Sequence, residues 1–313
     1  MQEEIRFATF NVCNLVPPGE RVYDNLEPYT QAQYEAKLDW TARQLDLLDA
    51  DVIGFQEIFS QDALKAVLAR TVNYRTAFHV GFDPDRRRER RTPSVALVSR
   101  LPLAGGGVEY TSFPSGVVMP EGEREPDRFA RPVVHAVVQA TPSLQVDVVV
   151  VHLKSKRPDY LEADEGGDTQ RYALACLRSL VRRGTEAVAL RILLSNLKRE
   201  AKRPRIVLGD FNDTAQAVTT DIVLGAGAPA GDRFYDAYRI QTSPRRDLAG
   251  AYSSVHEGAQ MTIDHILVSE EFNPARPEAV GEVIEVRYLN SHLTQGLPEA
   301  SDHGQVLARI RLY

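Results

Sequence analysis

Short apolar runs recur along the chain and constrain its fold more than any other feature. In the clearest run, residues 146–151, five of six consecutive positions are valine. Because alternate side chains of a strand point to opposite faces, such a run predicts a strand that is covered on both faces. In all, nine strand-like runs occur, several of them apolar on consecutive positions, at residues 5–12, 51–58, 74–80, 94–99, 132–139, 146–152, 205–209, 263–269 and 305–312.

Helical patterns lie between the predicted strands. Over residues 31–49, apolar side chains recur on one helix face, behind a capping box of Thr30 and Gln33. A second pattern begins at Asp168 or Thr169 and continues, with a break near Gly184, to about residue 199. Its apolar positions are Tyr172, Leu174, Ala175, Leu177 and Leu180. Predicted helices are interspersed with predicted strands, some of which follow one another directly. This order favours a mixed sheet, or two packed sheets with helices outside, over a purely parallel sheet.

Composition limits the class of protein. The chain has 313 residues, of which 43% are hydrophobic and 26% are charged, as expected of a folded protein with a sizeable core. No linker composition divides it, so we expect one domain over residues 1–313. No run of about 18 apolar residues occurs, and no membrane span is predicted. The net charge of -6 argues against bulk coating of nucleic acid but leaves a nuclease open.

Two features bear on location. Residues 1–2 lead almost directly into an apolar run, without the basic region or cleavage site of a secretory signal. Cys13 and Cys176 are too few for a zinc cluster or a disulfide framework, so we expect two reduced thiols. We therefore expect a cytoplasmic protein, although a secreted or periplasmic one whose leader had been removed would show the same sequence.

Polar residues of catalytic types stand where predicted strands stop. Asn11, Glu57 and His152 end three of the runs, and Asp210 with Asn212 ends a fourth. Ligands bind at strand ends in α/β proteins, because the loops there converge on one crevice. We therefore expect these side chains to share one site.

Two further acid–histidine pairs instead precede apolar strands. They are Asp264 with His265 and Asp302 with His303. If these pairs meet the first group at one rim, the last two strands must run opposite to the first four. Convergence of these residues on one site is thus enough, without further evidence, to require a mixed sheet. His265 stands within the strand, and we expect its role to be structural.

The residue types in this set support a narrow chemistry. Asn, Glu and Asp offer hard oxygen ligands, which suit Mg²⁺, with Mn²⁺ or Ca²⁺ as alternatives, rather than zinc. A metal and a histidine can neutralise charge on a phosphoryl group while a carboxylate orients or deprotonates water. Each residue alone has a structural alternative: Gly209 to Asn212 suits a turn, and Glu57 suits a helix cap near residues 60–70. The ordered combination favours hydrolysis of a phosphate ester.

Seven segments, in this order, carry the set. They are Thr-Phe-Asn-Val-Cys-Asn-Leu (9–15), Asp-Val-Ile-Gly-Phe-Gln-Glu (51–57), Val-Ala-Leu-Val-Ser-Arg (95–100), Val-Val-His-Leu-Lys-Ser-Lys (150–156), Ile-Val-Leu-Gly-Asp-Phe-Asn-Asp (206–213), Ile-Asp-His-Ile-Leu-Val-Ser (263–269) and Ser-Asp-His (301–303). Together they resemble the endonuclease/exonuclease/phosphatase superfamily, which includes pancreatic-type deoxyribonuclease, abasic-site endonucleases, inositol polyphosphate phosphatases and bacterial sphingomyelinases. The resemblance implies an α/β fold, a four-layer α/β/β/α sandwich of two mixed sheets flanked by helices.

The resemblance also implies a role for each residue of the set. Glu57 would be the principal metal ligand, with Asn11 binding metal or phosphate and Asp302 assisting with the metal. Asp210 would orient or activate the attacking water, and Asn212 would hold the phosphate. His152 would stabilise the transition state or protonate the leaving oxygen. His303 would contact the phosphate or transfer a proton, with Asp264 fixing its tautomer.

Basic residues favour a nuclease within the superfamily. The segment His-Leu-Lys-Ser-Lys at 152–156 resembles bacterial extracellular-type nucleases, and Lys154 and Lys156 would meet a neighbouring phosphate of a polynucleotide. Arg171, early on the following helix, would join them. The basic run at 86–91 is interpreted as a solvated loop. No element typical of abasic-site enzymes is recognisable.

The sequence thus predicts a metal-dependent phosphodiesterase that hydrolyses nucleic acid, with DNA favoured. The alternative is a phosphatase or sphingomyelinase-like enzyme with the same catalytic set and a different rim. No apolar hairpin in the sequence suggests membrane docking, which disfavours the lipid substrate. A third alternative, an inactive binding protein, is disfavoured because the full set is present. Nucleic acid is the expected partner, and no obligate protein partner is inferred.

Overall fold

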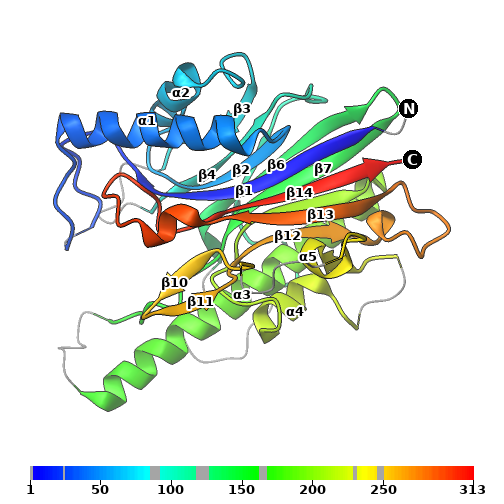
Figure 1. Cartoon of the computed structure of the whole chain (residues 1–313). Coiled ribbons are helices and arrows are strands. Elements are labelled where there is room, and N and C mark those ends of the chain that lie inside the picture. Colours follow the sequence, from blue (N-terminus) through cyan, green and yellow to red (C-terminus); the bar gives the residue numbers. More distant parts are fainter. Residues whose placement is uncertain are drawn as a thin grey trace.

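Two six-stranded sheets, packed face to face, form the centre of the fold (Figure 1). The computed structural model describes residues 3–23, 25–84, 92–117, 127–161, 168–227, 231–244 and 250–313. Helices cover the outer face of each sheet, and the four layers lie in the order helix, sheet, sheet, helix (Figure 1). The predicted α/β/β/α sandwich of two mixed sheets is confirmed.

The first sheet has the order β13-β14-β1-β2-β4-β3. Its strands are β13 (Gly281–Leu289), β14 (Gln305–Leu312), β1 (Glu4–Leu15), β2 (Val52–Ile58), β4 (Ser94–Ser99) and β3 (Phe78–Gly81). β1 runs parallel to β2 and antiparallel to β14. The opposite direction of β14 is the one that convergence of the site residues required.

The second sheet has the order β5-β6-β7-β8-β12-β9. Its strands are β5 (Val108–Ser112), β6 (Arg128–Thr141), β7 (Leu144–His152), β8 (Arg205–Asp210), β12 (Asp264–Ser269) and β9 (Phe234–Asp236). β7 runs parallel to β8, and β12 runs antiparallel to β8, again as convergence required. A separate hairpin joins β10 (Ser254–His256) to β11 (Ala259–Met261).

The valine run of β7 packs against two different layers. Val148 and Val150 belong to the core between the two sheets, whereas Val149 and Val151 belong to the core beneath the outer helices. The prediction of a strand covered on both faces is therefore correct. The sheets approach most closely at Gly54, where a Cβ atom would lie 2.8 Å from the Cβ of Leu208.

Two helices cover the first sheet. α1 (Gln31–Leu48) begins with the predicted capping box, and α2 (Gln61–Arg70) is capped by Ser60, whose hydroxyl accepts a hydrogen bond from the Ala63 amide. Leu38 and Leu45 of α1 and Leu64 of α2 pack on the outer faces of β1, β2 and β4. The amphipathic pattern of residues 31–49 was thus interpreted correctly.

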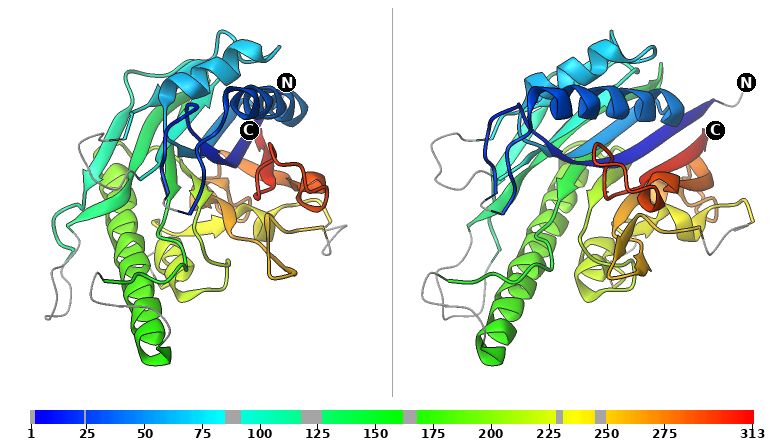
Figure 2. Two further views of the ribbon diagram at one scale, coloured as in Figure 1. Left: turned by 90° about the vertical axis from the view of Figure 1, so that its left-hand side faces the viewer. Right: turned by 60° about the vertical axis from the view of Figure 1, so that its left-hand side comes forward.

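The second long helix differs from its prediction in two ways. α3 (Thr169–Ala201) continues through Gly184 without a break. Of the apolar positions expected to pack, Ala175 is buried, but Tyr172, Leu174, Leu177 and Leu180 are exposed. The reason is that the first half of α3 projects beyond the sheets (Figure 2), so only the second half can reach a core. That core contact uses Ala187, Ala189, Leu190, Leu193, Leu194 and Leu197.

Several short or edge elements were not predicted. They are β5, β9, β10, β11 and β13 and the helices α4 (Val218–Leu224) and α5 (Ala237–Ile240). β13 is an edge strand whose apolar residues are interrupted by charged residues at 282, 285 and 287, so no continuous apolar run marks it in the sequence. The strand expected over residues 74–80 begins only at Phe78. Within the described ranges, no helix combines the length and apolar character needed to cross a membrane.

Candidate active site

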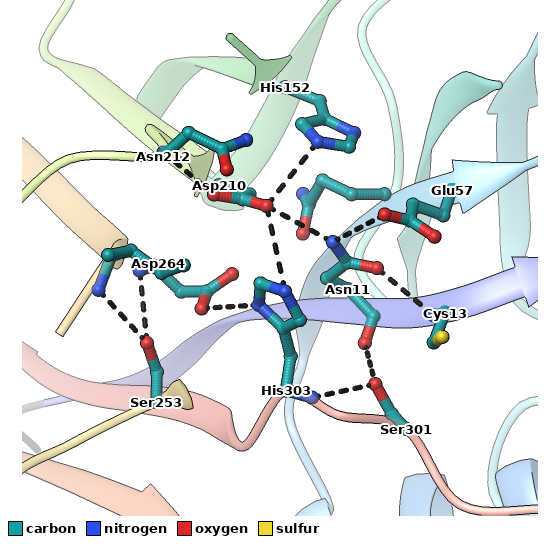
Figure 3. A network of polar contacts seen from close by, with 12 residues as sticks. Asn11, Cys13, Glu57, His152, Asp210, Asn212, Ser253, Asp264, Ser301 and His303 are labelled. Atoms are coloured by element: carbon teal, nitrogen blue, oxygen red, sulfur yellow. Dashed lines mark hydrogen bonds and ion pairs between the residues drawn. The ribbon is translucent and has the colours of Figure 1, made fainter. Parts of the chain in front are cut away.

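The strand ends of both sheets meet at one place, as Figure 3 shows. Asn11 lies on β1, Glu57 on β2, and His152 and Asp210 at the ends of β7 and β8. Asp264 opens β12 directly opposite Asp210, which is in turn paired with His152 across the sheet. Because β12 runs antiparallel to β8, the start of one strand and the end of the other reach the same rim.

Asp210 lies at the centre of this group. Its Oδ2 atom accepts a hydrogen bond from Asn11 Nδ2 at 3.1 Å and lies 3.4 Å from His152 Nε2 and 3.9 Å from His303 Nε2. Its Oδ1 atom accepts a hydrogen bond from the Asn212 amide at 2.8 Å. Four predicted site residues therefore contact or face a single carboxylate.

His303 is held in place by both its ring and its backbone. Its Nδ1 atom lies 2.8 Å from Asp264 Oδ2, the arrangement expected for fixing the tautomer. Its backbone amide donates to Ser301 Oγ, and that hydroxyl donates to the carbonyl oxygen of Asn11 at 2.6 Å. Ser253 supports the other partner, because its Oγ accepts from the Asp264 amide at 3.1 Å. The loop before β14 is thereby fastened to β1.

Glu57 is presented by an unusual backbone. It has a φ angle of 64°, and Cys13 and Asn14 on the neighbouring strand have values of 54° and 56°. Both strands have register shifts here, so their side chains are redirected at the ends of the ladder. Glu57 Oε2 accepts from the Asn14 amide at 3.0 Å, and Oε1 lies 3.3 Å from Asn11 Nδ2. Left-handed backbone at residues other than glycine is costly and is concentrated at functional sites.

Burial and charge set the protonation of the central groups. Burial and the nearby charge of Asp264 raise the pKa of Asp210. Burial alone would lower the pKa of His303, but the charge and hydrogen bond of Asp264 raise it well above its usual value. Burial, aided by the positive charges of Arg131 and His303, lowers the pKa of His152 well below its usual value. The surroundings thus favour the neutral form of His152 and the protonated form of His303.

A pocket of about 460 Å³ opens over these residues. Its lining includes the site residues Glu57, His152, Asp210, Asn212 and His303. It also includes basic and aromatic side chains, namely Tyr23, Arg131, Lys154, Arg157, Tyr160 and Arg182. This volume falls within the usual range for sites of small ligands.

The model of one protein family matches nearly the whole chain. It is described as the Endonuclease/Exonuclease/phosphatase family, and it matches residues 8–303. The chain belongs to the endonuclease/exonuclease/phosphatase family. The resemblance predicted from the seven sequence segments is thus confirmed, and the family's members are phosphoesterase hydrolases that include nucleases, phosphodiesterases and phosphatases.

Solved structures of this family share the fold over their whole length. An endonuclease/exonuclease/phosphatase family protein from Bacteroides thetaiotaomicron is 16% identical, with a TM-score of 0.61, and the match covers 100% of this chain and 96% of the other. The human Nocturnin catalytic domain with bound sulfate is 15% identical, with a TM-score of 0.60 and coverages of 100% and 98%. A Bacteroides thetaiotaomicron mannosyl-6-phosphatase is 17% identical, with a TM-score of 0.60 and coverages of 98% and 99%. No curated protein matches the chain.

The donor set fits the divalent metals that this endonuclease/exonuclease/phosphatase family commonly uses. One ligand atom each of Asp210, Asp264 and His303 lies within 4.8 Å of the others, and all three residues are buried. Asp264 Oδ1 is buried and has no hydrogen-bond partner among the described residues. An unpaired buried carboxylate oxygen is costly unless a cation or a proton donor meets it. The set is rich in hard oxygen donors, which suit Mg²⁺, Mn²⁺ or Ca²⁺.

Three of the predicted site residues lie outside the group around Asp210. Asp302 is exposed and lies beside Cys13, where burial, followed by the charge of Asp302, raises the pKa of the thiol. Lys156 is exposed and forms an ion pair with Asp213 at 2.9 Å. Arg171 lies exposed in the first turn of α3. Of the predicted basic residues, only Lys154 lines the pocket, and the basic run at 86–91 lies outside the described residues.

Several functional residues were missed in the sequence. Ser301 stands in the Ser-Asp-His segment and could have been found there, since it directly precedes the acid–histidine pair. Arg131 and Arg182 carry no local signal, because only the packing of β6 and α3 brings them to the pocket. His265 has the structural role expected of it: its ring nitrogens lie 2.9 Å from Asp236 Oδ2 and 2.9 Å from the Asp213 carbonyl oxygen.

Proposed function

We propose that the protein is a divalent-metal-dependent phosphodiesterase that hydrolyses nucleic acid, with DNA favoured. The observation that carries the proposal is the group around Asp210, in which two histidines and an amide meet one carboxylate at the floor of a pocket with a basic wall. Hydrolysis of a phosphodiester needs a positioned water, charge neutralisation on the phosphate and assistance to the leaving oxygen. The basic wall suits a polyanionic substrate.

Metal binding is assigned to the acidic residues of the site. Glu57 and Asn11 would hold the ion, with Asp302, which lies exposed beside Cys13, as a further candidate. The buried group of Asp210, Asp264 and His303 is the alternative place for the ion, and an ion there would replace the roles given to these three residues below. Mg²⁺ is proposed, with Mn²⁺ or Ca²⁺ as alternatives. When bound, such an ion would supply positive charge that neutralises the phosphoryl oxygens.

The chain's own residues provide the remaining functions. Asp210 orients the attacking water and takes its proton, which its raised pKa allows. His303, protonated and aligned by Asp264, donates a hydrogen bond from Nε2 to a phosphate oxygen. Asn212 holds the phosphate through its side-chain Nδ2, which has two hydrogens and donates one of them to the Leu153 carbonyl oxygen at 3.0 Å.

The protonation of His152 narrows its role. Because its pKa is lowered well below the usual value, His152 is neutral and donates a hydrogen bond rather than a proton to the developing charge. This favours transition-state stabilisation over protonation of the leaving oxygen, the two roles left open by the sequence.

A substrate panel tests the proposal. The protein is incubated with plasmid, single-stranded DNA, RNA, a chromogenic phosphomonoester and sphingomyelin, each with Mg²⁺, Mn²⁺ or EDTA. We expect cleavage of nucleic acid that EDTA abolishes and that Glu57→Gln reduces by orders of magnitude. Glu282→Gln, a change on the edge strand β13, is the matched control and retains the full rate. Metal-independent cleavage, or no cleavage of any nucleic acid, contradicts the proposal.

A second candidate is a phosphatase acting on a small phosphoester. It is favoured by the size of the pocket, which at about 460 Å³ matches a small ligand. For the lipid version, the exposed apolar residues Tyr172, Leu174 and Leu177 of α3 provide a surface that the sequence did not suggest. Turnover of the monoester or of sphingomyelin alone in the same panel would select this candidate.

A further inference from the structure

The pocket is lined by charges of both signs. The carboxylates of Glu57 and Asp210 belong to the catalytic group. Among the described residues, the rest of the lining forms a basic wall of four basic side chains and one carboxylate, and its charged residues are Arg131, Lys154, Arg157, Arg182 and Asp159. The metal and the scissile phosphate account for the two catalytic carboxylates, but neither accounts for this excess of positive charge.

A buried glutamate behind the wall offsets part of its charge. Glu186 is 1% exposed, and its two carboxylate oxygens accept hydrogen bonds from the backbone amides of Ala130 at 2.9 Å and Lys154 at 2.7 Å. Burial raises its pKa, and the charges of Arg131 and Arg182 oppose that rise. Glu186 therefore fixes the strand ends that carry Arg131 and Lys154, and with Asp159 it sets two carboxylates against four basic side chains.

The two arginines of the wall keep unused hydrogen-bonding capacity. Arg131 donates to the Leu153 carbonyl at 3.3 Å, and Arg182 lies 3.7 Å from the Asp159 carboxylate. The Nε atoms of both arginines are buried and have no hydrogen-bond partner among the residues that the structure describes. Lys154 Nζ is bonded to the carbonyl oxygens of Ser155 and Arg157 and to the hydroxyl of Ser179, and within the described ranges its hydrogen bonds go to no carboxylate.

Holding these cations together is costly without an anion. Burial lowers the pKa of Lys154 to about 8; the charges of Arg131 and Arg182 add to this shift, and those of Asp159 and Glu186 oppose it. Like charges that are partly desolvated and incompletely hydrogen-bonded destabilise a fold, and proteins retain such clusters where an anionic ligand neutralises them. Arginine in particular matches phosphate through its fork of donors.

We propose that this wall is a second anion subsite, which binds a phosphate of the substrate other than the one that is cleaved. The subsite comprises Arg131, Lys154, Arg157 and Arg182, and Tyr23 and Tyr160 flank it in the same pocket. The inference rests on the proposed phosphodiesterase function and deepens it. The preferred substrate is a phosphodiester that carries a further phosphate on one side.

Dinucleotides separate this inference from the proposed function. The rates of cleavage of TpT, pTpT and TpTp are compared, which differ only in a terminal phosphate. We expect one of the two phosphorylated dinucleotides to exceed TpT in kcat/KM by about ten- to hundredfold, the range of a charge-assisted contact. Arg182→Gln should remove most of this preference, measured as the ratio of kcat/KM for the preferred dinucleotide to that for TpT. Equal rates on all three substrates would overturn the subsite while leaving the phosphodiesterase function intact.

Binding without turnover provides a second readout. Inorganic pyrophosphate is titrated calorimetrically in the presence of EDTA, so that no metal contributes. Wild-type protein should bind it, Arg182→Gln should weaken binding by about tenfold, and Arg182→Lys should recover only part of the loss because it lacks the planar fork. Arg199→Gln, which removes an exposed arginine elsewhere on α3, is the control and binds like wild type. Equal affinity in the wild-type and Arg182→Gln proteins would disprove the subsite.

Discussion

At the scale of single residues, Ser301 shows how a small side chain can align a site. Its hydroxyl donates to the Asn11 carbonyl and accepts from the His303 amide. A metal-binding candidate on β1 and a catalytic histidine before β14 are thereby fixed relative to each other. The sequence indicated Asn11 and His303 by their residue type and their place at strand ends. A serine has no comparable chemical signature.

Removal of this link should slow the reaction more than it weakens binding. Ser301→Ala leaves the His303 amide without its acceptor, and a small displacement of a catalytic group costs up to about a hundredfold in rate. We expect kcat on plasmid to fall about ten- to hundredfold with little change in KM, while Ser301→Thr retains most of the rate. A Ser301→Ala enzyme with wild-type kcat would show that the hydroxyl has no positioning role.

Lys154 gives the site a predicted pH dependence. Its pKa is lowered to about 8, so its positive charge is present below that pH and is lost as the pH rises through it. The preference for a substrate with a second phosphate should therefore decline above about pH 8. Lys154→Arg, which keeps its charge, should move this decline to higher pH. The decline is measured as the pH dependence of the ratio of kcat/KM for the preferred dinucleotide to kcat/KM for TpT. A ratio independent of pH would contradict the prediction.

At the scale of elements, the spacing of apolar residues predicted burial correctly where an element has the same surroundings along its whole length. It predicted burial wrongly where the surroundings change along the element. The valines of β7 contact two cores, and their pattern was read correctly. α3 has one continuous pattern, but only its second half meets the second sheet's core, which no local signal reveals. β13 was missed because charged residues interrupt the apolar residues of this edge strand.

Gly54 tests the close packing of the two sheets. A Cβ atom there would lie 2.8 Å from Leu208 Cβ and 3.1 Å from a methyl carbon of Val150, so Gly54→Ala must push the sheets apart. Overpacking of this kind costs about 1–3 kcal/mol in the free energy of unfolding, measurable by urea denaturation. Gly106→Ala, at a position with no atom within 4 Å of the added carbon, should change it by less than about 0.5 kcal/mol. Similar stabilities for the two variants would show that the sheets can adjust freely.

At the scale of the whole molecule, strand direction explains why the site exists. β1 and β2, and β7 and β8, end at the rim where β12 and β14 begin, so residues from Asn11 to His303 meet there. These strand directions could be predicted from the sequence, because the polar residues at the strand ends can meet at one site only if β12 and β14 run opposite to the other four strands. The basic wall could not, since Arg131 and Arg182 are brought together by the packing of α3 against the end of β6.

The central claim is that Asp210 activates water for attack on a phosphodiester. The most direct measurement is the rate of plasmid cleavage by Asp210→Asn at saturating Mg²⁺, with the thermal unfolding midpoint recorded alongside. The substitution keeps the size of the side chain and removes its ability to take a proton. We expect a loss of at least about a thousandfold in rate from a folded protein. A variant that cleaves plasmid as fast as wild type would contradict this account.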